Sequence, residues 1–184
     1  MKTYLIIGGT SGIGLETTKL LSQNNRVIVL SRTNKNLDGL INVEYHSADV
    51  TKSIDNLPQI DDSIDGLVYC PGTINLKPLK SLKLEDFQND FEVNLLGAVK
   101  TINKYFNNLK SAGKASIVLF STVAVQTGMP YHASVASSKG AVEGLTRTLA
   151  AEFAPNIRVN CIAPSITNTP LAEKLLNNET KVKA

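Results

Sequence analysis

The sequence predicts an α/β protein built on a doubly wound parallel sheet, with helices on both faces. Two observations predict this fold class. Short apolar runs of strand length alternate along the chain with longer segments of helical periodicity. In addition, the first apolar run ends in a glycine-rich turn that leads into a helical segment. Because parallel strands are connected through helices by right-handed crossovers, this alternation favours a three-layer sandwich.

Six strands are expected, because strands buried on both faces read as continuous apolar runs. These runs cover residues 3–7, 26–30, 43–46, 65–70, 115–120 and 157–162. Helical periodicity covers residues 12–23, the long stretch 84–109, residues 137–153 before Pro155, and a short piece at 171–176. No linker or internal repeat divides the chain, so we expect residues 1–184 to form a single domain.

Composition and charge exclude several classes of protein. The 184 residues carry 19 Lys and Arg against 16 Asp and Glu, which gives a formal net charge of +3. This balance gives no reason to expect nucleic acid or a membrane surface as a partner. The apolar run at 4–7 is too short for a signal-peptide core or a membrane span. Two cysteines, Cys70 and Cys161, are too few for a disulfide framework and have no metal-ligand spacing. We therefore expect a cytoplasmic protein without a metal site.

The turn after the first strand has the composition of a phosphate-binding loop. Its sequence is Gly8-Gly9-Thr10-Ser11-Gly12-Ile13-Gly14, and it lies between a buried strand and a helix. Glycines allow the backbone to approach a pyrophosphate, and the N-terminus of the helix offers free N–H donors. A plain strand–turn–helix connection is the alternative. The context favours a dinucleotide site, with contacts from Gly8, Thr10, Ser11, Gly12, Ile13 and Gly14.

Further motifs follow this turn in a fixed order. They are Asp49-Val50, Cys70-Pro71-Gly72, Asn94 within VNLLG, Ser121-Thr122, Lys139 within SSKGAVEGLTRTLAAEFA, and the segment APSITNTPL. Together with the GxxxGxG spacing of the first turn, they make nearly the whole chain similar to the short-chain dehydrogenase/reductase family. The resemblance implies a Rossmann-like fold and a nicotinamide dinucleotide as cofactor. It is imperfect at the Cys70 turn, where only Gly72 is retained from the family's Asn-Asn-Ala-Gly sequence.

The resemblance also assigns roles to individual residues. Asp49 and Val50 correspond to the pair that contacts the adenine ring, and Asn94 and Lys139 correspond to active-site residues that also contact the cofactor. The remaining cofactor contacts that it implies are Cys70, Gly72, Pro164, Ile166 and Thr169.

The choice between the two nicotinamide cofactors depends on the end of the second strand. Sheets that bind NAD place an acidic residue there to hold the ribose 2′-hydroxyl. This sequence has Ser31 followed by Arg32. A guanidinium binds a 2′-phosphate in a charge-assisted pair, whereas a carboxylate repels it. A solvated surface arginine is the alternative, and we expect NADP(H).

The catalytic centre departs from the family pattern, which places Tyr-x-x-x-Lys on one helix. Counting four residues back from Lys139 gives Val135, and thirteen residues before Val135 lies Thr122, where the family has its catalytic serine. Since both counts agree, the register is secure. Thr122 still offers a hydroxyl to a carbonyl group, but Val135 has no proton to donate.

Two nearby groups are candidates to replace the missing phenol. Tyr131 stands two helical turns before Lys139 if the helical phase extends that far, and His132 follows it. Each also has a structural interpretation, Tyr131 as an aromatic residue at the rim and His132 as a partly exposed polar residue. Asn94 could instead hydrogen-bond the backbone of a neighbouring strand. Lys139 could instead contact only the ribose hydroxyls of the bound cofactor. We take Asn94, Thr122, Lys139 and Tyr131 as the catalytic set.

The C-terminal part of the sequence is a second departure. Family members continue past the sixth strand through a substrate-covering segment to a seventh strand, but here residues 171–184 are polar and helix-like. We expect six strands, with the substrate segment absent or truncated after about residue 170. Either the protein pairs this edge with another subunit, or the sequence is incomplete, which we favour.

Two classes of function remain open on the sequence. The first is an NADP(H)-dependent oxidoreductase that transfers a hydride between nicotinamide and a small carbonyl or alcohol. The second is a catalytically impaired dinucleotide-binding protein, acting as a partner subunit or a redox sensor, and Val135 favours it. The resemblance, together with surplus apolar residues on the helix at 137–153, also favours a homo-dimer or homo-tetramer formed through the two long helices.

Overall fold

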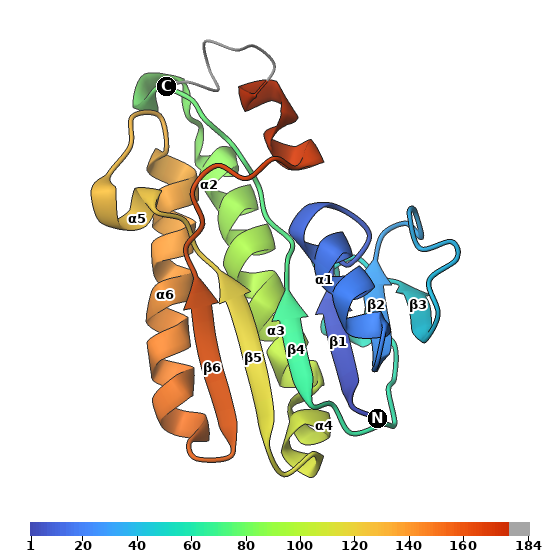
Figure 1. Ribbon diagram of the computed structural model, residues 1–184. Helices are drawn as coiled ribbons and strands as arrows, with labels where there is room; N and C mark the ends of the chain where they lie inside the picture. Colours follow the sequence, from blue (N-terminus) through green and yellow to red (C-terminus); the bar gives the residue numbers. More distant parts are fainter. Residues whose placement is uncertain (177–184) are drawn as a thin grey trace.

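The computed structural model describes residues 1–176, apart from the side chain of Lys174, and its centre is a parallel sheet (Figure 1). The described residues form six strands in the order β3-β2-β1-β4-β5-β6, and every neighbouring pair is parallel. Their bounds are Thr3–Ile7, Arg26–Ser31, Val43–Ser47, Gly66–Tyr69, Ala115–Phe120 and Ile157–Ile162, for β1 to β6 in turn. The predicted doubly wound sheet of six strands is confirmed.

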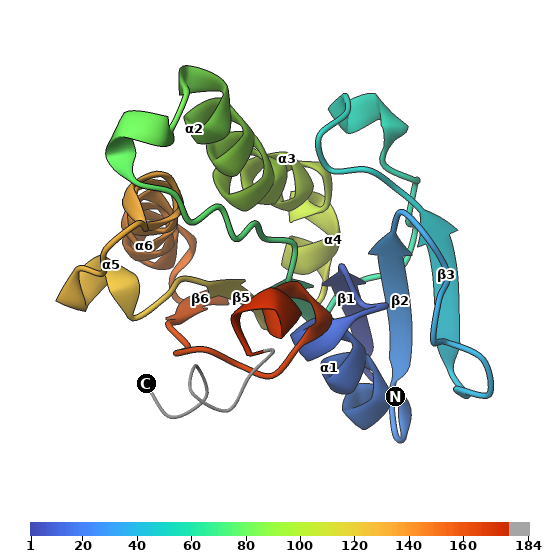
Figure 2. The same ribbon diagram turned by 90° about the horizontal axis from the view of Figure 1, so that it is seen from above.

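Helices cover the sheet unequally (Figure 2). One face carries α1 (Gly12–Ser22) beside the N-terminal half of the sheet. In the part of the chain that the structure describes, the opposite face carries four helices: α2 (Leu84–Phe91), α3 (Gly97–Lys104), α4 (Phe106–Ser111) and α6 (Ala133–Phe153). The described residues also form short elements: α5 (Ala124–Thr127) and the turns η1 (Ile54–Asn56), η2 (Leu79–Ser81) and η4 (Pro170–Leu175).

The prediction of one continuous helix over residues 84–109 is wrong in two places. A π-helical turn, η3 (Glu92–Leu96), separates α2 from α3. A second break follows at Tyr105, whose φ of −104° and ψ of 14° end α3. The ring of Tyr105 is buried, and its hydroxyl donates to the carbonyl of Pro58 at 2.8 Å. This tertiary contact, which sequence periodicity does not reveal, accompanies the break.

Two other predicted helices also need correction. The helix predicted at 137–153 begins four residues earlier, at Ala133, because Ser134 and Val135 are buried against the rest of the protein. The short helical piece predicted at 171–176 is the 3₁₀ turn η4, which begins at Pro170. The rest of the predicted polar tail, residues 177–184, lies outside the described residues.

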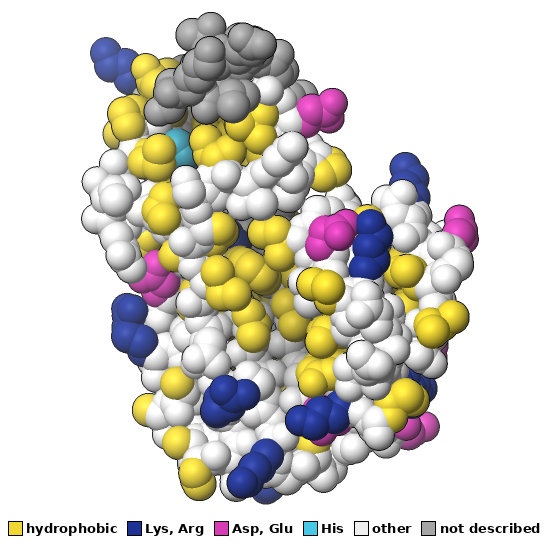
Figure 3. Space-filling view, in the orientation of Figure 1, with side chains coloured by type: hydrophobic (Ala, Val, Ile, Leu, Met, Phe, Trp, Pro, Cys, Tyr) yellow, Lys and Arg dark blue, Asp and Glu magenta, His cyan; other side chains and the backbone are white. Residues whose placement is uncertain are grey.

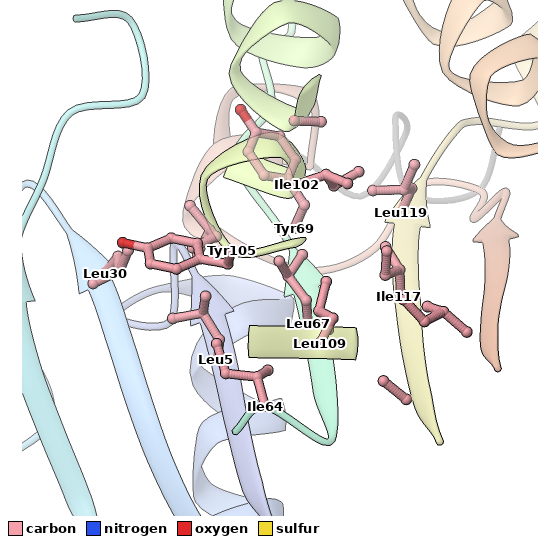
Figure 4. Close-up of a cluster of buried hydrophobic side chains, with 14 of the residues drawn as sticks. Leu5, Leu30, Ile64, Leu67, Tyr69, Ile102, Tyr105, Leu109, Ile117 and Leu119 are labelled. Atoms are coloured by element: carbon pink, nitrogen blue, oxygen red, sulfur yellow. The ribbon is translucent and has the colours of Figure 1, made fainter. Parts of the chain in front are cut away.

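The main hydrophobic core lies between the sheet and the four-helix face (Figure 4). Apolar side chains of β1, β4 and β5 meet Ile102 of α3 and Leu109 of α4 there. Tyr69 of β4 fits the same core because Gly97 has no side chain: a Cβ at this position would collide with the Tyr69 hydroxyl. That hydroxyl instead donates to the carbonyl of Val93 at 2.6 Å.

The face that carries α1 is less completely covered near β5 and β6. Val118 and Phe120 are only half-buried, and Ile162 is half exposed. Hydrophobic side chains gather on this face of the molecule, beside α1 and below η4 (Figure 3). None of the described helices is both long and apolar enough to cross a lipid bilayer.

The sheet topology predicts two free thiols. Cys70 follows β4 and Cys161 lies in β6, with β5 between them, and neither is in a disulfide. Two strand spacings separate them by roughly 10 Å, beyond the reach of a disulfide. Ellman titration of the unfolded, unreduced protein is expected to find two thiols per chain. A count near zero without an intermolecular dimer would contradict the topology.

Candidate functional site

The main cleft lies at the carboxyl ends of the strands, where the strand order reverses between β1 and β4. This switch point is where doubly wound sheets bind ligands. The cleft has a volume of about 820 Å³ and adjoins an inner pocket of about 190 Å³. Both are lined by Ile13, Cys70, Gly72, Thr73, Thr169 and Leu171. The two hollows therefore form one continuous site.

The glycine-rich turn forms the floor of the cleft. Gly8 and Gly12 have φ values of 76° and 52°, in the left-handed region that favours glycine. A Cβ on Gly14 would collide with the carbonyl oxygen of Gly8. The turn is therefore closed tightly enough for α1 to begin beside the strand and direct its N-terminus at the cleft. All six turn residues predicted to bind the cofactor line the cleft: Gly8, Thr10, Ser11, Gly12, Ile13 and Gly14.

The ends of β2 and β3 form the far wall of the cleft. This wall includes the four residues that the sequence predicts to contact the adenosine end of a dinucleotide: Ser31, Arg32, Asp49 and Val50. The Ser31 hydroxyl lies 2.8 Å from the Thr10 hydroxyl and so connects this wall to the floor. Hydrogen bonds from Thr51, together with the charges of Arg32 and Lys52, hold the pKa of Asp49 below its usual value.

Lys35 also lines the cleft on this side, and the sequence reasoning did not assign it. The sequence signal for this contact is a second basic residue three positions after Arg32. With Arg32, it gives the wall two side chains that carry positive charge, which suits an anionic group on a ligand.

The turn Cys70-Pro71-Gly72 lies where the cleft meets the inner pocket, since Cys70 and Gly72 line both. A Cβ on Gly72 would stand 3.4 Å from Asn94 Oδ1 and 3.5 Å from Lys139 Nζ, so this turn lies close to both side chains. Burial raises the pKa of the Cys70 thiol to about 12. Cys70 is therefore a neutral wall residue and not a nucleophile.

A buried polar network holds Asn94 behind this turn. Asn94 lies in the π-helical turn η3, and its Oδ1 accepts from the Thr73 N–H at 3.1 Å. Its Nδ2 donates to Thr73 Oγ1 at 3.0 Å and to Ser138 Oγ at 2.9 Å. Thr73 Oγ1 donates in turn to Asp90 Oδ1 at 2.6 Å. These contacts fix the Asn94 amide, and Thr73, Asp90 and Ser138 are supporting residues that the sequence reasoning missed.

Lys139 is the charged group at the centre of the site. Only 8% of the residue is exposed, and its Nζ donates to the carbonyl of Phe120 at 2.9 Å. Burial lowers the pKa of Lys139 to about 8, and the nearby Asp90 carboxylate opposes that effect in part. An amine with this pKa exchanges protons readily near neutral pH, which suits a site for proton transfer.

The end of β5 supplies two hydroxyls to the inner pocket, those of Ser121 and Thr122. Ser121 Oγ donates to Glu143 Oε1 at 2.7 Å, so its proton is committed. Thr122 Oγ1 accepts a 3.3 Å bond from the Ala124 N–H and keeps its own proton for another acceptor. Thr122, the residue that the register selected, is the free donor of the pair.

The first turn of α6 places the residues around the missing phenol. Val135 lines the inner pocket and is 6% exposed. The predicted helical phase does not reach Tyr131, because α6 begins at Ala133 and Tyr131 has a left-handed φ of 69°. Tyr131 is 59% exposed and lines neither the cleft nor the inner pocket, whereas His132 does line the pocket.

The loop after β6 closes the site from the other side. Pro164, Ile166 and Thr169 line the inner pocket, and the Thr169 methyl lies 3.2 Å from where a Cβ on Gly12 would stand. The loop therefore reaches from β6 to the glycine-rich turn. In the part of the chain that is described, no three His, Cys, Asp or Glu side chains form a group able to hold a metal ion.

This fold and cleft define a dinucleotide-binding α/β protein. Comparison with known proteins gives the family. The model of the short chain dehydrogenase family matches residues 2–180, so the chain belongs to this family of oxidoreductases, which bind nicotinamide dinucleotides.

Individual relatives and structures agree with this assignment. The chain is 29% identical to cyclopentanol dehydrogenase of a Comamonas species, over 100% of this chain and 80% of the relative. It is 33% identical to the 3-oxoacyl-(acyl-carrier-protein) reductase FabG of Thermotoga maritima, over 95% and 77% of the two chains. A crystal structure of a short chain dehydrogenase family protein from Francisella tularensis superposes with a TM-score of 0.88 at 30% identity, covering 95% of this chain and 74% of that one.

The burial of the Lys139 ammonium is expected to lower the stability of the folded protein. Its pKa in the folded protein, about 8, lies below the ordinary value of 10.5. The unfolded chain therefore binds more protons between these values, so the cost is full below pH 8 and disappears as pH rises toward 10.5. The difference corresponds to at most about 3 kcal/mol. Lys139→Met is expected to raise the free energy of unfolding at pH 7 and to lose most of this gain by pH 10, as measured by urea titration. A variant that is less stable than the wild type at both pH values would contradict the assignment.

Proposed function

We propose that the chain is an NADP(H)-dependent oxidoreductase that transfers a hydride between nicotinamide and a small carbonyl or alcohol substrate. One observation carries this proposal. A continuous surface runs from the cationic wall at Arg32, across the glycine-rich turn, to Thr122 and Lys139 in the inner pocket. Such a surface suits a dinucleotide at one end and a reacting oxygen at the other.

The cleft fits a dinucleotide because its floor is a cradle that side chains would fill. The glycine-rich turn and the N-terminus of α1 would hold the pyrophosphate, since the first N–H groups of a helix have no partner within it. Asp49 and Val50 would hold the adenine ring, and Arg32 the 2′-phosphate. When bound, the nicotinamide supplies or accepts the hydride.

The chain's own residues organise the rest of the reaction. The Thr122 hydroxyl donates to the substrate oxygen and polarises the carbonyl. Lys139 holds positive charge beside that oxygen, and Asn94 is fixed behind it by Thr73. The loop carrying Pro164, Ile166 and Thr169 covers one side of the pocket. We leave Tyr131 out of this relay because it lies outside the pocket.

The inner pocket favours a small apolar substrate. Its volume is about 190 Å³, and its walls include Ile74, Leu76, Ile166, Leu171 and Leu175. The Comamonas relative is named for cyclopentanol, a small cyclic alcohol. Cyclopentanone and cyclopentanol are therefore suitable test substrates, in the two directions of the reaction.

Val135 keeps a second candidate function open, that of a dinucleotide-binding subunit or sensor without hydride transfer. An apolar side chain at this position lines the pocket and removes the usual proton donor. The two functions differ in one measurement: the binding protein would bind NADP(H) and turn over neither cyclopentanone nor cyclopentanol.

We also propose that two copies pair through α3 and α6. Leu145, Leu149 and Phe153 of α6 are half-buried and line a groove with Val99 and Phe106. A self-complementary helical face of this kind suits a two-fold interface.

Cofactor preference is the first test of the proposal. NADPH is expected to bind at least about tenfold tighter than NADH, equivalent to about 1.4 kcal/mol, because the Arg32 guanidinium pairs with the 2′-phosphate. Arg32→Ala is expected to erase most of the preference in fluorescence titrations, and Lys35→Ala a smaller part. Arg158→Ala is the matched control, since Arg158 is exposed on β6 outside the cleft. Equal affinities of the wild type for both nucleotides would overturn the NADP(H) assignment.

Restoring a phenol is the second test. Val135→Tyr places a hydroxyl one helical turn before Lys139, whose ammonium favours the ionised phenol. General acid catalysis contributes about 10²- to 10⁴-fold, so NADPH-dependent reduction of cyclopentanone is expected to be at least about tenfold faster in this variant than in Val135→Phe. Val135→Phe adds the same ring without the hydroxyl and is expected to give no increase. Equal rates for the two variants would contradict the role assigned to this position.

A further inference from the structure

We propose that His132 is the general acid and base of the site, in place of the missing phenol; this inference rests on the proposed oxidoreductase function. Carbonyl reduction needs one proton at the substrate oxygen, and alcohol oxidation must remove one. The donor must therefore lie on the wall of the inner pocket. His132 lines this pocket together with Thr122, Val135 and Lys139.

The ring of His132 is held in one tautomer. Its Nδ1 lies 2.7 Å from the carbonyl oxygen of Pro130. A carbonyl oxygen only accepts hydrogen bonds, so Nδ1 carries a proton and donates it. Nε2 is then the nitrogen that exchanges protons: it has a lone pair in the neutral ring and an N–H in the imidazolium. No side-chain partner of Nε2 is found among the described residues.

Helical spacing places His132 on the same stripe as the rest of the centre. His132 caps α6, and Val135 and Lys139 follow three and seven residues later. Residues with this spacing lie above one another on one helix face. Val135 stands between the other two in sequence, and all three residues line the inner pocket. The arrangement is therefore consistent with a catalytic centre in which His132 takes the role of the phenol that Val135 replaces.

The other polar groups of the pocket are less suited to this role. Ser121 donates to Glu143, and the Cys70 thiol is neutral, with a pKa raised to about 12 by burial. Thr122 is an ordinary hydroxyl that polarises the carbonyl but does not ionise near neutral pH.

Lys139 is the rival donor, but it is 8% exposed, whereas His132 is only half-buried and able to regain a proton from water. The ionisable groups around His132 are few. Lys139 and Cys70 are the other ionisable side chains of the described pocket wall. On the neighbouring segment, the Lys77 N–H bonds the Tyr131 carbonyl, while the Lys77 ammonium is paired with Asp86 at 2.9 Å.

The proposed step balances. The reduced nicotinamide would give up a hydride, with loss of its own C–H bond, and the carbonyl carbon would take this hydride in a new C–H bond. The π electron pair of the C=O bond moves to oxygen, which takes the proton from His132 Nε2 and forms an O–H bond. His132 becomes neutral and regains a proton from solvent. In alcohol oxidation, neutral Nε2 removes the hydroxyl proton, and the hydride would leave the carbon for the oxidised nicotinamide.

Two variants test the step while keeping the fold. His132→Asn retains an amide donor for the Pro130 carbonyl, and His132→Gln places an amide near the position of Nε2; neither side chain carries a transferable proton. Both are expected to reduce cyclopentanone turnover at least about 100-fold. NADPH affinity is expected to stay within twofold of the wild type. His46→Gln is the matched control, because His46, the other histidine of the chain, pairs with Glu44 on β3.

The pH profile separates His132 from Lys139. Reduction by the wild type is expected to fall as the pH rises, because a general acid must carry a proton to donate it. This fall is expected to disappear in His132→Asn. If it persists in the variant, the acid is another group, with Lys139 as the candidate. Val135→Tyr in the His132→Asn background is expected to restore turnover at least about tenfold, which a merely structural role of His132 would not allow.

A measurement without turnover completes the test. In ¹⁵N NMR spectra of the nucleotide-free protein, His132 is expected to show the Nδ1–H tautomer, and its Nε2 signal to shift when cyclopentanol is added, whereas His46 does not respond. An Nε2–H tautomer, or full turnover in both His132 variants, overturns the assignment of His132 alone. A wild type that binds NADPH but converts neither test substrate overturns the proposed function as well.

Discussion

The burial of one ammonium group, that of Lys139, is the constraint on which the site depends. The side chain is almost fully enclosed, and its Nζ is held by the carbonyl at the end of β5. Desolvation of a charge is unfavourable unless polar groups surround it. The Gly72 turn lies close to the Lys139 ammonium because Gly72 has no side chain. The Asn94 amide lies close to the same turn, and it is carried by the π-helical turn η3. An apolar side chain at this buried position would make the folded protein more stable than a lysine does, so the lysine indicates a functional role.

The departures from the family pattern are connected through the first turn of α6. Beginning the helix at Ala133 places His132 at its cap and buries Val135 in the pocket wall. The same start leaves Tyr131 in a left-handed conformation outside the site. Val135 at the phenol position and the pocket-lining His132 thus lie at the same end of α6.

Much of the fold followed from local patterns, because buried parallel strands carry continuous apolar runs. The bounds predicted for β5 and β6 are those observed. The glycine-rich turn and the residues near Arg32 line the cleft, since their positions depend on strand ends that the pattern locates. Other features depend on tertiary contacts. The helix break at Tyr105 accompanies a hydrogen bond to Pro58, and the buried network of Thr73 and Asp90 joins segments distant in sequence. No periodicity encodes such contacts.

Transfer of a labelled hydride tests the central claim most directly. The protein would be incubated with cyclopentanone and NADPH that carries deuterium at the transferable position of the nicotinamide. Mass spectrometry of the product alcohol is expected to show one deuterium on the carbon that bears the hydroxyl. This result would establish that a chain with Val135 at the phenol position transfers a hydride. Nucleotide binding without deuterium in any alcohol product, under the same conditions, would contradict the account.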